Sequence, residues 1–231
     1  MKRGGIAVVT DSGHDIDDAQ FPKKRTEDGH ELLATVDVDW QQTMLGGQQV
    51  AHGRIAEEST AEIKTTRIRT DGGVEVDREE TDVVPQATEF AHVPGEFLVT
   101  ESTQDDFADR LMETATDATI HRAQVDLESF AAAHPNADPW MGWFRASDGP
   151  IDSGAAYGDI DSEPDLAEFI HSNENSQLGL TNLKYDGRLL KLVLSESGWI
   201  AIYDPKDMDT IEFTRFIHDE VLPHTSPKLM S

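Results

Sequence analysis

The chain has 231 residues, contains no cysteine, and carries 45 acidic against 19 basic residues, which gives a formal net charge of −26. The absence of cysteine excludes disulfides, thiolate metal sites and cysteine nucleophiles. The length suffices for one large domain or two small ones, each with its own core. No apolar run approaches the roughly 20 residues that a membrane-spanning helix needs. The N-terminus also lacks the apolar core of a signal peptide, so we expect a cytoplasmic protein that does not contact a membrane.

The acidic excess extends along the whole chain and does not form a separate tail. Such a charge destabilises a compact state in dilute buffer, but at 1 M salt the screening length falls to about 3 Å and the repulsion largely vanishes. Four Trp and nine Phe, together with periodic apolar segments, argue against a disordered chain. We therefore expect a folded halophilic protein of haloarchaeal type.

The first hundred residues are rich in strand and turn patterns. Residues 6–10 and 31–38 are short apolar segments that predict strands. Residues 62–70 and 74–84 flank an Asp-Gly-Gly sequence, and they predict a hairpin because glycine tolerates the positive φ of tight reversals. Both flanking segments are charged, so we expect an edge hairpin with one face in solvent.

An approximate domain boundary is expected near residue 95. Pro85 and the Pro94-Gly95 step have the character of a linker that leads into a new strand. The chain then divides into a β-rich N-terminal region over 1–95 and an α+β C-terminal region over 96–231, or it forms one continuous domain.

Two short helices are expected after the boundary. Thr103 and Asp106 form a Thr-x-x-Asp capping pattern ahead of an apolar helical face. Residues 120–125 resemble a strand. Asp126 is placed to cap a short helix over residues 127–133, which a following proline ends.

The last hundred residues alternate strand and helix signals. The patterns predict, in order, a core strand, a helix, a hairpin around an Asp-Gly turn, a third strand and an amphipathic terminal helix, over residues 140–144, 163–170, 177–194, 199–203 and 208–222. The expected fold class is α+β, with a mixed, largely antiparallel sheet, a C-terminal three-stranded meander and a terminal helix.

The predicted strand at residues 6–10 runs into a carboxylate-rich loop. Hard divalent cations take several oxygen ligands that converge on one point, and a loop at a strand end can supply them. The loop is similar over fewer than ten residues to the calcium loop of nucleoside hydrolases, but Ser12 stands where that loop has proline, so the likeness implies no family. Carboxylates also cluster by chance in so acidic a chain, and a solvated loop is the other interpretation. The candidate ligands are Asp11, Asp15, Asp17 and Asp18, with His14 as a candidate acid or base.

A local group of basic and aromatic residues stands out against the acidity. Three bases lie on the predicted C-terminal hairpin and two aromatic residues on the next strand, and cations beside aromatics can contact phosphates or bases. A solvated sheet face with cross-strand ion pairs is the other interpretation. Nucleic acid is a disfavoured partner, because three bases cannot easily offset so negative a field. The candidate binding residues are Lys184, Arg188, Lys191, Trp199 and Tyr203.

Catalytic signatures are missing from the sequence. It has no Gly-x-Ser-x-Gly elbow, no phosphate-binding loop and no paired-histidine zinc motif. We therefore expect an accessory or protein-interaction protein that needs no cofactor and binds an unknown protein partner. The alternative is a metal-dependent hydrolase or phosphoesterase that holds a divalent cation in the acidic loop. The expected interface is the aromatic set Trp140, Trp143, Trp199 and Tyr203.

Overall fold

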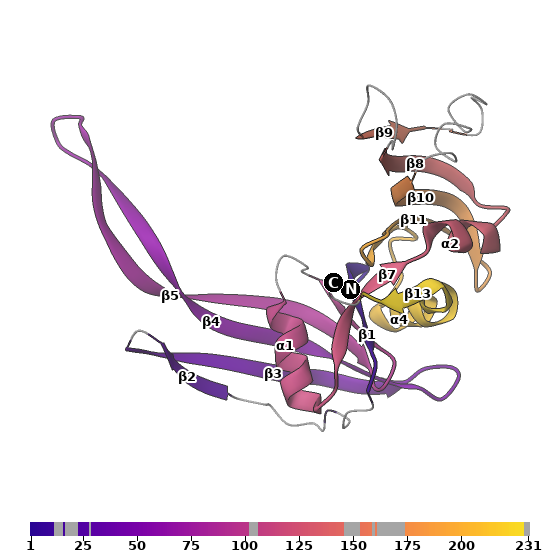
Figure 1. Cartoon of the computed structure of the whole chain (residues 1–231), viewed down its shortest axis with the longest axis horizontal. Helices are drawn as coiled ribbons and strands as arrows, with labels where there is room; N and C mark the ends of the chain where they lie inside the picture. The colour runs from indigo at the N-terminus through magenta and orange to yellow at the C-terminus, as the bar shows by residue number, and fades with distance from the viewer. Residues whose placement is uncertain are drawn as a thin grey trace.

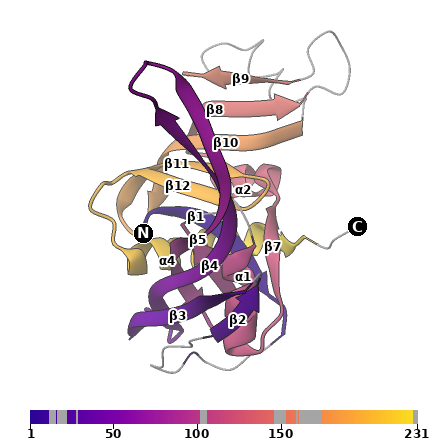
Figure 2. The same cartoon turned by 90° about the vertical axis from the view of Figure 1, so that its left-hand side faces the viewer.

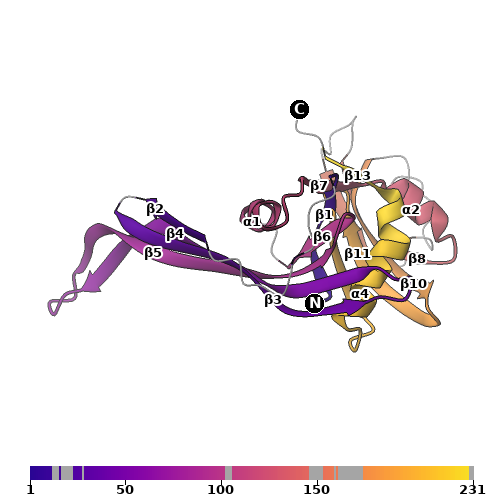
Figure 3. The ribbon, with the colours of Figure 1, turned by 90° about the horizontal axis from the view of Figure 1, so that it is seen from below.

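The computed structural model describes residues 1–11, 16, 23–27, 29–101, 106–145, 153–158, 160 and 174–228, with the backbone alone for 63–67, 75–80, 145, 174 and 175. A bent antiparallel sheet forms most of the molecule, and a long hairpin projects from it (Figure 1). Figure 3 places the tip of this hairpin at one end of the long axis and the C-terminal helices at the other.

The N-terminal half of the sheet is built from strands of very different length. They are β1 (Arg3–Val9), β2 (Lys23–Glu27), β3 (His30–Thr43), β4 (Gln49–Ile68), β5 (Val74–Val93) and β6 (Phe97–Thr100). β3 pairs with β4 only as far as Glu57, and β6 pairs with β5 only from Phe90 onward. Residues 58–85 therefore project beyond the sheet as a two-stranded arm (Figure 1).

The arm differs from the predicted edge hairpin. Its strands begin at Gln49 and end at Val93, and their bases lie inside the sheet between β3 and β6. Pro85 lies within β5, in the arm, where a strand has a free side and can accept a proline. β5 and β6 pair directly across the Pro94-Gly95 turn, so the proposed boundary falls at a tight turn within one sheet, and the division into two regions stays a prediction.

The C-terminal half contains the remaining strands and the helices that the structure describes. They are α1 (Phe107–Thr116), β7 (Ile120–Val125), α2 (Leu127–Ala133), β8 (Asp138–Arg145), β9 (Ser153–Tyr157), β10 (Glu174–Tyr185), β11 (Arg188–Ser195), β12 (Trp199–Asp204), α4 (Thr210–Phe216), the π-helical turn η2 (Ile217–Val221), the 3₁₀ turn η3 (Leu222–His224) and β13 (Thr225–Pro227). β10, β11 and β12 form the predicted meander. Asp186 and Gly187 both have positive φ, as a two-residue hairpin turn requires.

The helix N-termini show which of the predicted capping residues make a cap hydrogen bond. Asp126 caps α2 as predicted, because its side chain accepts a hydrogen bond from the Ser129 N–H at 2.9 Å. α1 begins at Phe107, later than predicted, and Asp106 makes no side-chain cap bond. Thr103 and the helix predicted at residues 163–170 lie outside the described residues.

The predicted terminal helix is confirmed in outline. It begins with a capping box between Asp209 and Glu212, and it continues beyond α4 as η2 and η3. Among the described residues, no helix is long and apolar enough to cross a membrane.

β1 is the centre of the fold. The sheet runs in the order β2-β3-β4-β5-β6-β1-β12-β11-β10-β8-β9, and Figure 2 shows β12 to β9 stacked beyond β1. β1 pairs with β6 on one edge, and on the other edge first with β12 and then with β7, which leaves the sheet to pair with β13. Gly198 lies at this branch with φ +80°, and a Cβ there would come within 2.9 Å of Ala123.

Two apolar clusters cover opposite faces of the N-terminal strands, because alternate side chains of a strand point to opposite faces. Phe90 and Leu98 belong to the cluster beneath α1. Ala91 and Val93 belong to the larger cluster, which includes α2, α4 and the inner face of the C-terminal sheet. The architecture is thus a largely antiparallel sheet with a C-terminal helix. Every strand pair in the described part is antiparallel, so the expected mixed sheet is not seen there.

Candidate functional site

The C-terminal sheet has one face packed against the helices and one face turned away from them, which we call the outer face. On β12, Ile200 and Ile202 belong to the core cluster beside α4. The alternating residues Trp199, Ala201 and Tyr203 therefore lie on the outer face. Lys191 lies on the same face of β11, because its neighbour Leu192 is in the core cluster.

Trp140 comes to the outer face through a local irregularity in β8. The register between β8 and β10 shifts at this point, so that Gly179 pairs with Met141 while the next residue pairs with Pro139. The extra residue bends the strand and redirects a side chain. The indole then occupies the space over Gly179, where a Cβ would come within 2.9 Å of it. Its Nε1 donates to the Leu180 and Leu192 carbonyls at 3.2 and 3.3 Å.

The Trp140 indole contacts Lys191 and Tyr203, and the exposed Leu189 lies two residues before Lys191 on the same face of β11. We call Trp140, Leu189, Lys191 and Tyr203 the aromatic patch. The Tyr203 ring meets the indole edge to face, with centroids 6.2 Å apart and an interplanar angle of 88°. The Lys191 ammonium lies 4.2 Å from the indole centroid, within the range of a cation–π contact. Tyr203 is 51% exposed and Leu189 is 53% exposed. The patch thus presents exposed apolar surface around an indole ring that hydrogen bonds hold in place.

The predicted basic group does not share one surface. Lys184 pairs across the hairpin with Leu189 and is exposed. Arg188 turns instead toward α4, where it forms ion pairs with Glu212 at 3.2 Å and with Asp207. Its charge is neutralised there, so the three bases do not form a continuous cationic face. Trp199 is half-buried.

The aromatic set predicted as an interface is divided between two places. Trp199 and Tyr203 line a groove of about 500 Å³ beside the N-terminus. Trp143 lies apart, at the far end of the sheet, where it is 42% exposed and lines a second groove of about 540 Å³. Strand β8 is confirmed as a strand with a buried Phe144, although Trp143 points to solvent.

The acidic loop falls almost wholly outside the described residues. His14, Asp15, Asp17 and Asp18 are not described, and of the candidate ligands only Asp11 is. Asp11 is exposed, and its carboxylate accepts a hydrogen bond from the Thr119 hydroxyl at 3.1 Å. Within the described ranges, no group of three or more histidines and carboxylates is arranged to hold a metal ion. The cation site therefore stays a prediction.

A buried histidine that sequence reasoning passed over lies on β5. His92 is 1% exposed, and neither ring nitrogen has a hydrogen-bond partner among the described residues. Burial lowers its pKa to about 4, because a charged imidazolium loses its hydration in the core. The ring is therefore neutral at physiological pH. No local sequence signal distinguishes this histidine from a surface one.

Replacement of His92 by Leu is expected to remove a stability loss in acid. The unfolded His takes up a proton below about pH 6.5 while the folded one resists until about pH 4, so His92 lowers the free energy of unfolding by about 2 kcal/mol between about pH 7.5 and pH 5. Asp109 opposes this, because burial raises its pKa to about 6 although Arg122 lowers it. The buried Asp109 carboxylate lowers the stability of the fold at neutral pH, and this loss is relieved as the pH falls and the carboxylate takes up a proton.

Urea unfolding at the two pH values measures this difference. The free energy of unfolding of His92→Leu should fall less between neutral and acid pH than that of the wild type. An equal acid loss in the two proteins would contradict the assignment, and His92→Phe serves as a second apolar variant in case Leu packs poorly.

No protein-family model matches this chain, and none of the curated proteins matches it. The proposed function therefore rests on the residues of the candidate site alone.

The sequence analysis named Lys191, Trp140 and Tyr203 but not Leu189. It also could not foresee that the β8 irregularity joins the first three, because the register shift depends on pairing with β10.

Proposed function

We propose that the chain is a non-catalytic interaction protein of a high-salt cytoplasm and that it binds a protein partner through the aromatic patch. The observation that carries the proposal is the exposed Tyr203 held edge to face on Trp140, with Lys191 over the indole. Protein interfaces concentrate their binding energy in a few Trp, Tyr and Arg residues, which are surrounded by apolar contacts that exclude water.

The patch is suited to binding because its framework is fixed before a partner arrives. The two hydrogen bonds of the Trp140 indole to strand carbonyls hold the ring in place. Tyr203 packs on that ring, so little side-chain freedom remains to be lost on association. Burial of apolar and aromatic surface also survives molar salt, which screens interactions between exposed charges.

Tyr203→Ala is expected to weaken partner binding roughly 30-fold, as loss of a hot spot of about 2 kcal/mol implies. The tagged protein is used to capture partners from a lysate of the source cells in about 2 M KCl, and the captured partner is then titrated by calorimetry. Trp143→Ala is the matched control, because Trp143 is an exposed aromatic residue of the same sheet outside the patch. Equal partner affinity in wild type and Tyr203→Ala would overturn the proposal.

A further inference from the structure

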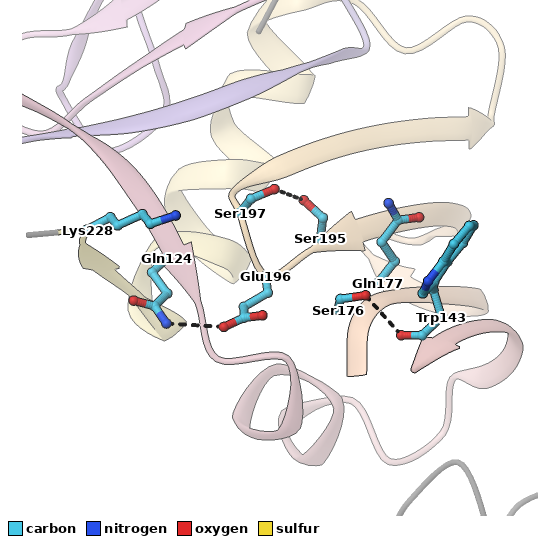
Figure 4. Close-up of a pocket in the computed structure, with 8 residues that line it drawn as sticks. All are labelled: Gln124, Trp143, Ser176, Gln177, Ser195, Glu196, Ser197 and Lys228. Atoms are coloured by element: carbon cyan, nitrogen blue, oxygen red, sulfur yellow. Dashed lines mark hydrogen bonds between the residues drawn. The ribbon is translucent and has the colours of Figure 1, made fainter. Parts of the chain in front are cut away.

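A second groove, of about 540 Å³, lies at the far end of the C-terminal sheet and shares no residue with the aromatic patch. Its floor follows one row of cross-strand neighbours. Trp143 on β8 pairs with Gln177 on β10, which pairs with Ser195 on β11. Paired residues of neighbouring strands lie side by side on one face. Figure 4 shows the Gln177 amide beside the Trp143 indole.

The wall of the groove comes from the β11–β12 turn and from β7. The hydroxyls of Ser195 and Ser197 face each other at 3.0 Å (Figure 4). Ser195 is fixed further, because its hydroxyl oxygen accepts a hydrogen bond from the Trp199 N–H at 2.9 Å. The Gln124 amide donates to the Glu196 carboxylate at 3.2 Å. The wall thus offers hydroxyl and amide groups, which both donate and accept, together with a carboxylate that only accepts.

The charges of this groove do not select an ion. Among the residues that the structure describes, its charged lining residues are Glu196 and Lys228, which have opposite signs. An anionic ligand would also have to approach a chain with a net charge of −26. A neutral ligand with many hydrogen-bonding groups fits this lining better than a nucleotide or an acidic peptide.

The exposed indole supplies the remaining part of the site. Trp143 is 42% exposed at the edge of the polar row, so one part of its ring surface is open to a ligand. A flat aromatic ring beside hydroxyl and amide groups matches a molecule with an apolar ring face and a polar rim. Pyranose rings have this form, because their C–H bonds gather on one face and their hydroxyls at the edge.

We infer that this groove is a saccharide-binding site, in which a sugar ring stacks on Trp143 and its hydroxyls bind Gln177, Glu196 and the exposed Ser197 hydroxyl, which the buried Ser195 holds in place. This function goes beyond the proposed protein interaction and uses different residues. Stacking and neutral hydrogen bonds lose little strength in molar salt, where binding by surface charge is screened.

The test uses an array of neutral and acidic oligosaccharides, probed with the full-length protein in about 2 M KCl. The affinity of each oligosaccharide that binds is then measured by calorimetric titration. At least one neutral oligosaccharide should bind the wild type. Trp143→Ala should weaken it at least about tenfold, and Gln177→Ala should weaken it by a smaller factor. Trp143→Phe should retain much of the affinity, because a smaller aromatic ring can still stack.

Tyr203→Ala is the matched control, since it removes an exposed aromatic residue from the patch and leaves the groove intact. It should bind the saccharide as the wild type does, so failure of the saccharide site is distinguishable from failure of the partner interface. Circular dichroism checks that each variant is folded. The inference is overturned if the folded wild type binds no oligosaccharide, if Trp143→Ala binds as tightly as wild type, or if nucleoside monophosphates bind more tightly than sugars.

Discussion

Transfer of the folded protein from about 2 M KCl into salt-free buffer is expected to unfold it or to lower its thermal midpoint strongly. The chain has 26 unbalanced negative charges, which form roughly 300 like-charge pairs. Each pair repels by about 0.2 kcal/mol at about 20 Å in water. The unfolded chain keeps only part of this repulsion, because its charges lie farther apart. The repulsion that unfolding relieves is therefore large compared with the free energy of unfolding of native proteins, which is roughly 5–15 kcal/mol.

Circular dichroism melts across a KCl series measure this effect. Sucrose at matched osmolarity is the control, because it is excluded from the protein surface but does not screen charge. The charge mechanism predicts recovery in KCl or NaCl and not in sucrose. Glu62→Lys, at an exposed position on β4, should lower the salt concentration needed for folding. Identical spectra and midpoints with and without salt would contradict the prediction that the protein is halophilic.

Gly53→Ala is expected to destabilise the fold by about 3 kcal/mol or more. Gly53 lies on β4 opposite an irregular part of β3, where the register shifts between Val38 and Trp40. A Cβ on Gly53 would lie 1.9 Å from the Asp37 carbonyl oxygen. Backbone atoms cannot move aside without breaking the ladder, so β3 and β4 must separate at this point.

Thermal unfolding in high salt compares this variant with Gly73→Ala. Gly73 lies in the turn of the arm, and the three atoms nearest to a Cβ there would be side-chain atoms of Arg69 and Asp71, at 3.1 to 3.2 Å. Both side chains are exposed and can move, so the control should change the free energy of unfolding by less than about 1 kcal/mol. A shift of the midpoint by about 6–12 °C is expected for Gly53→Ala. Equal midpoints for the two variants would show that the β3–β4 contact is not as close as described.

The outer face shows why the sequence predicted only some residues of the candidate sites. Lys191 and Tyr203 were recognisable from their residue types, but the position of Arg188 depends on Glu212, which lies 24 residues further along the chain. The groove beside Trp143 joins Gln124 with Ser176 and Ser195. Residues so far apart in sequence carry no common pattern, and each of them alone is an ordinary polar surface residue.

The sequence by itself determined the acidic character, the C-terminal meander, the cap of α2 and the presence of the terminal helix. Each of these depends on residues that are close together, such as Asp186 and Gly187 in their turn. Only the tertiary structure decided the length of the arm, the branch at β1 and the surfaces where Trp140 and Trp143 lie. These features depend on pairing between strands distant in sequence, and such pairing is selected by burial and register that no local pattern records.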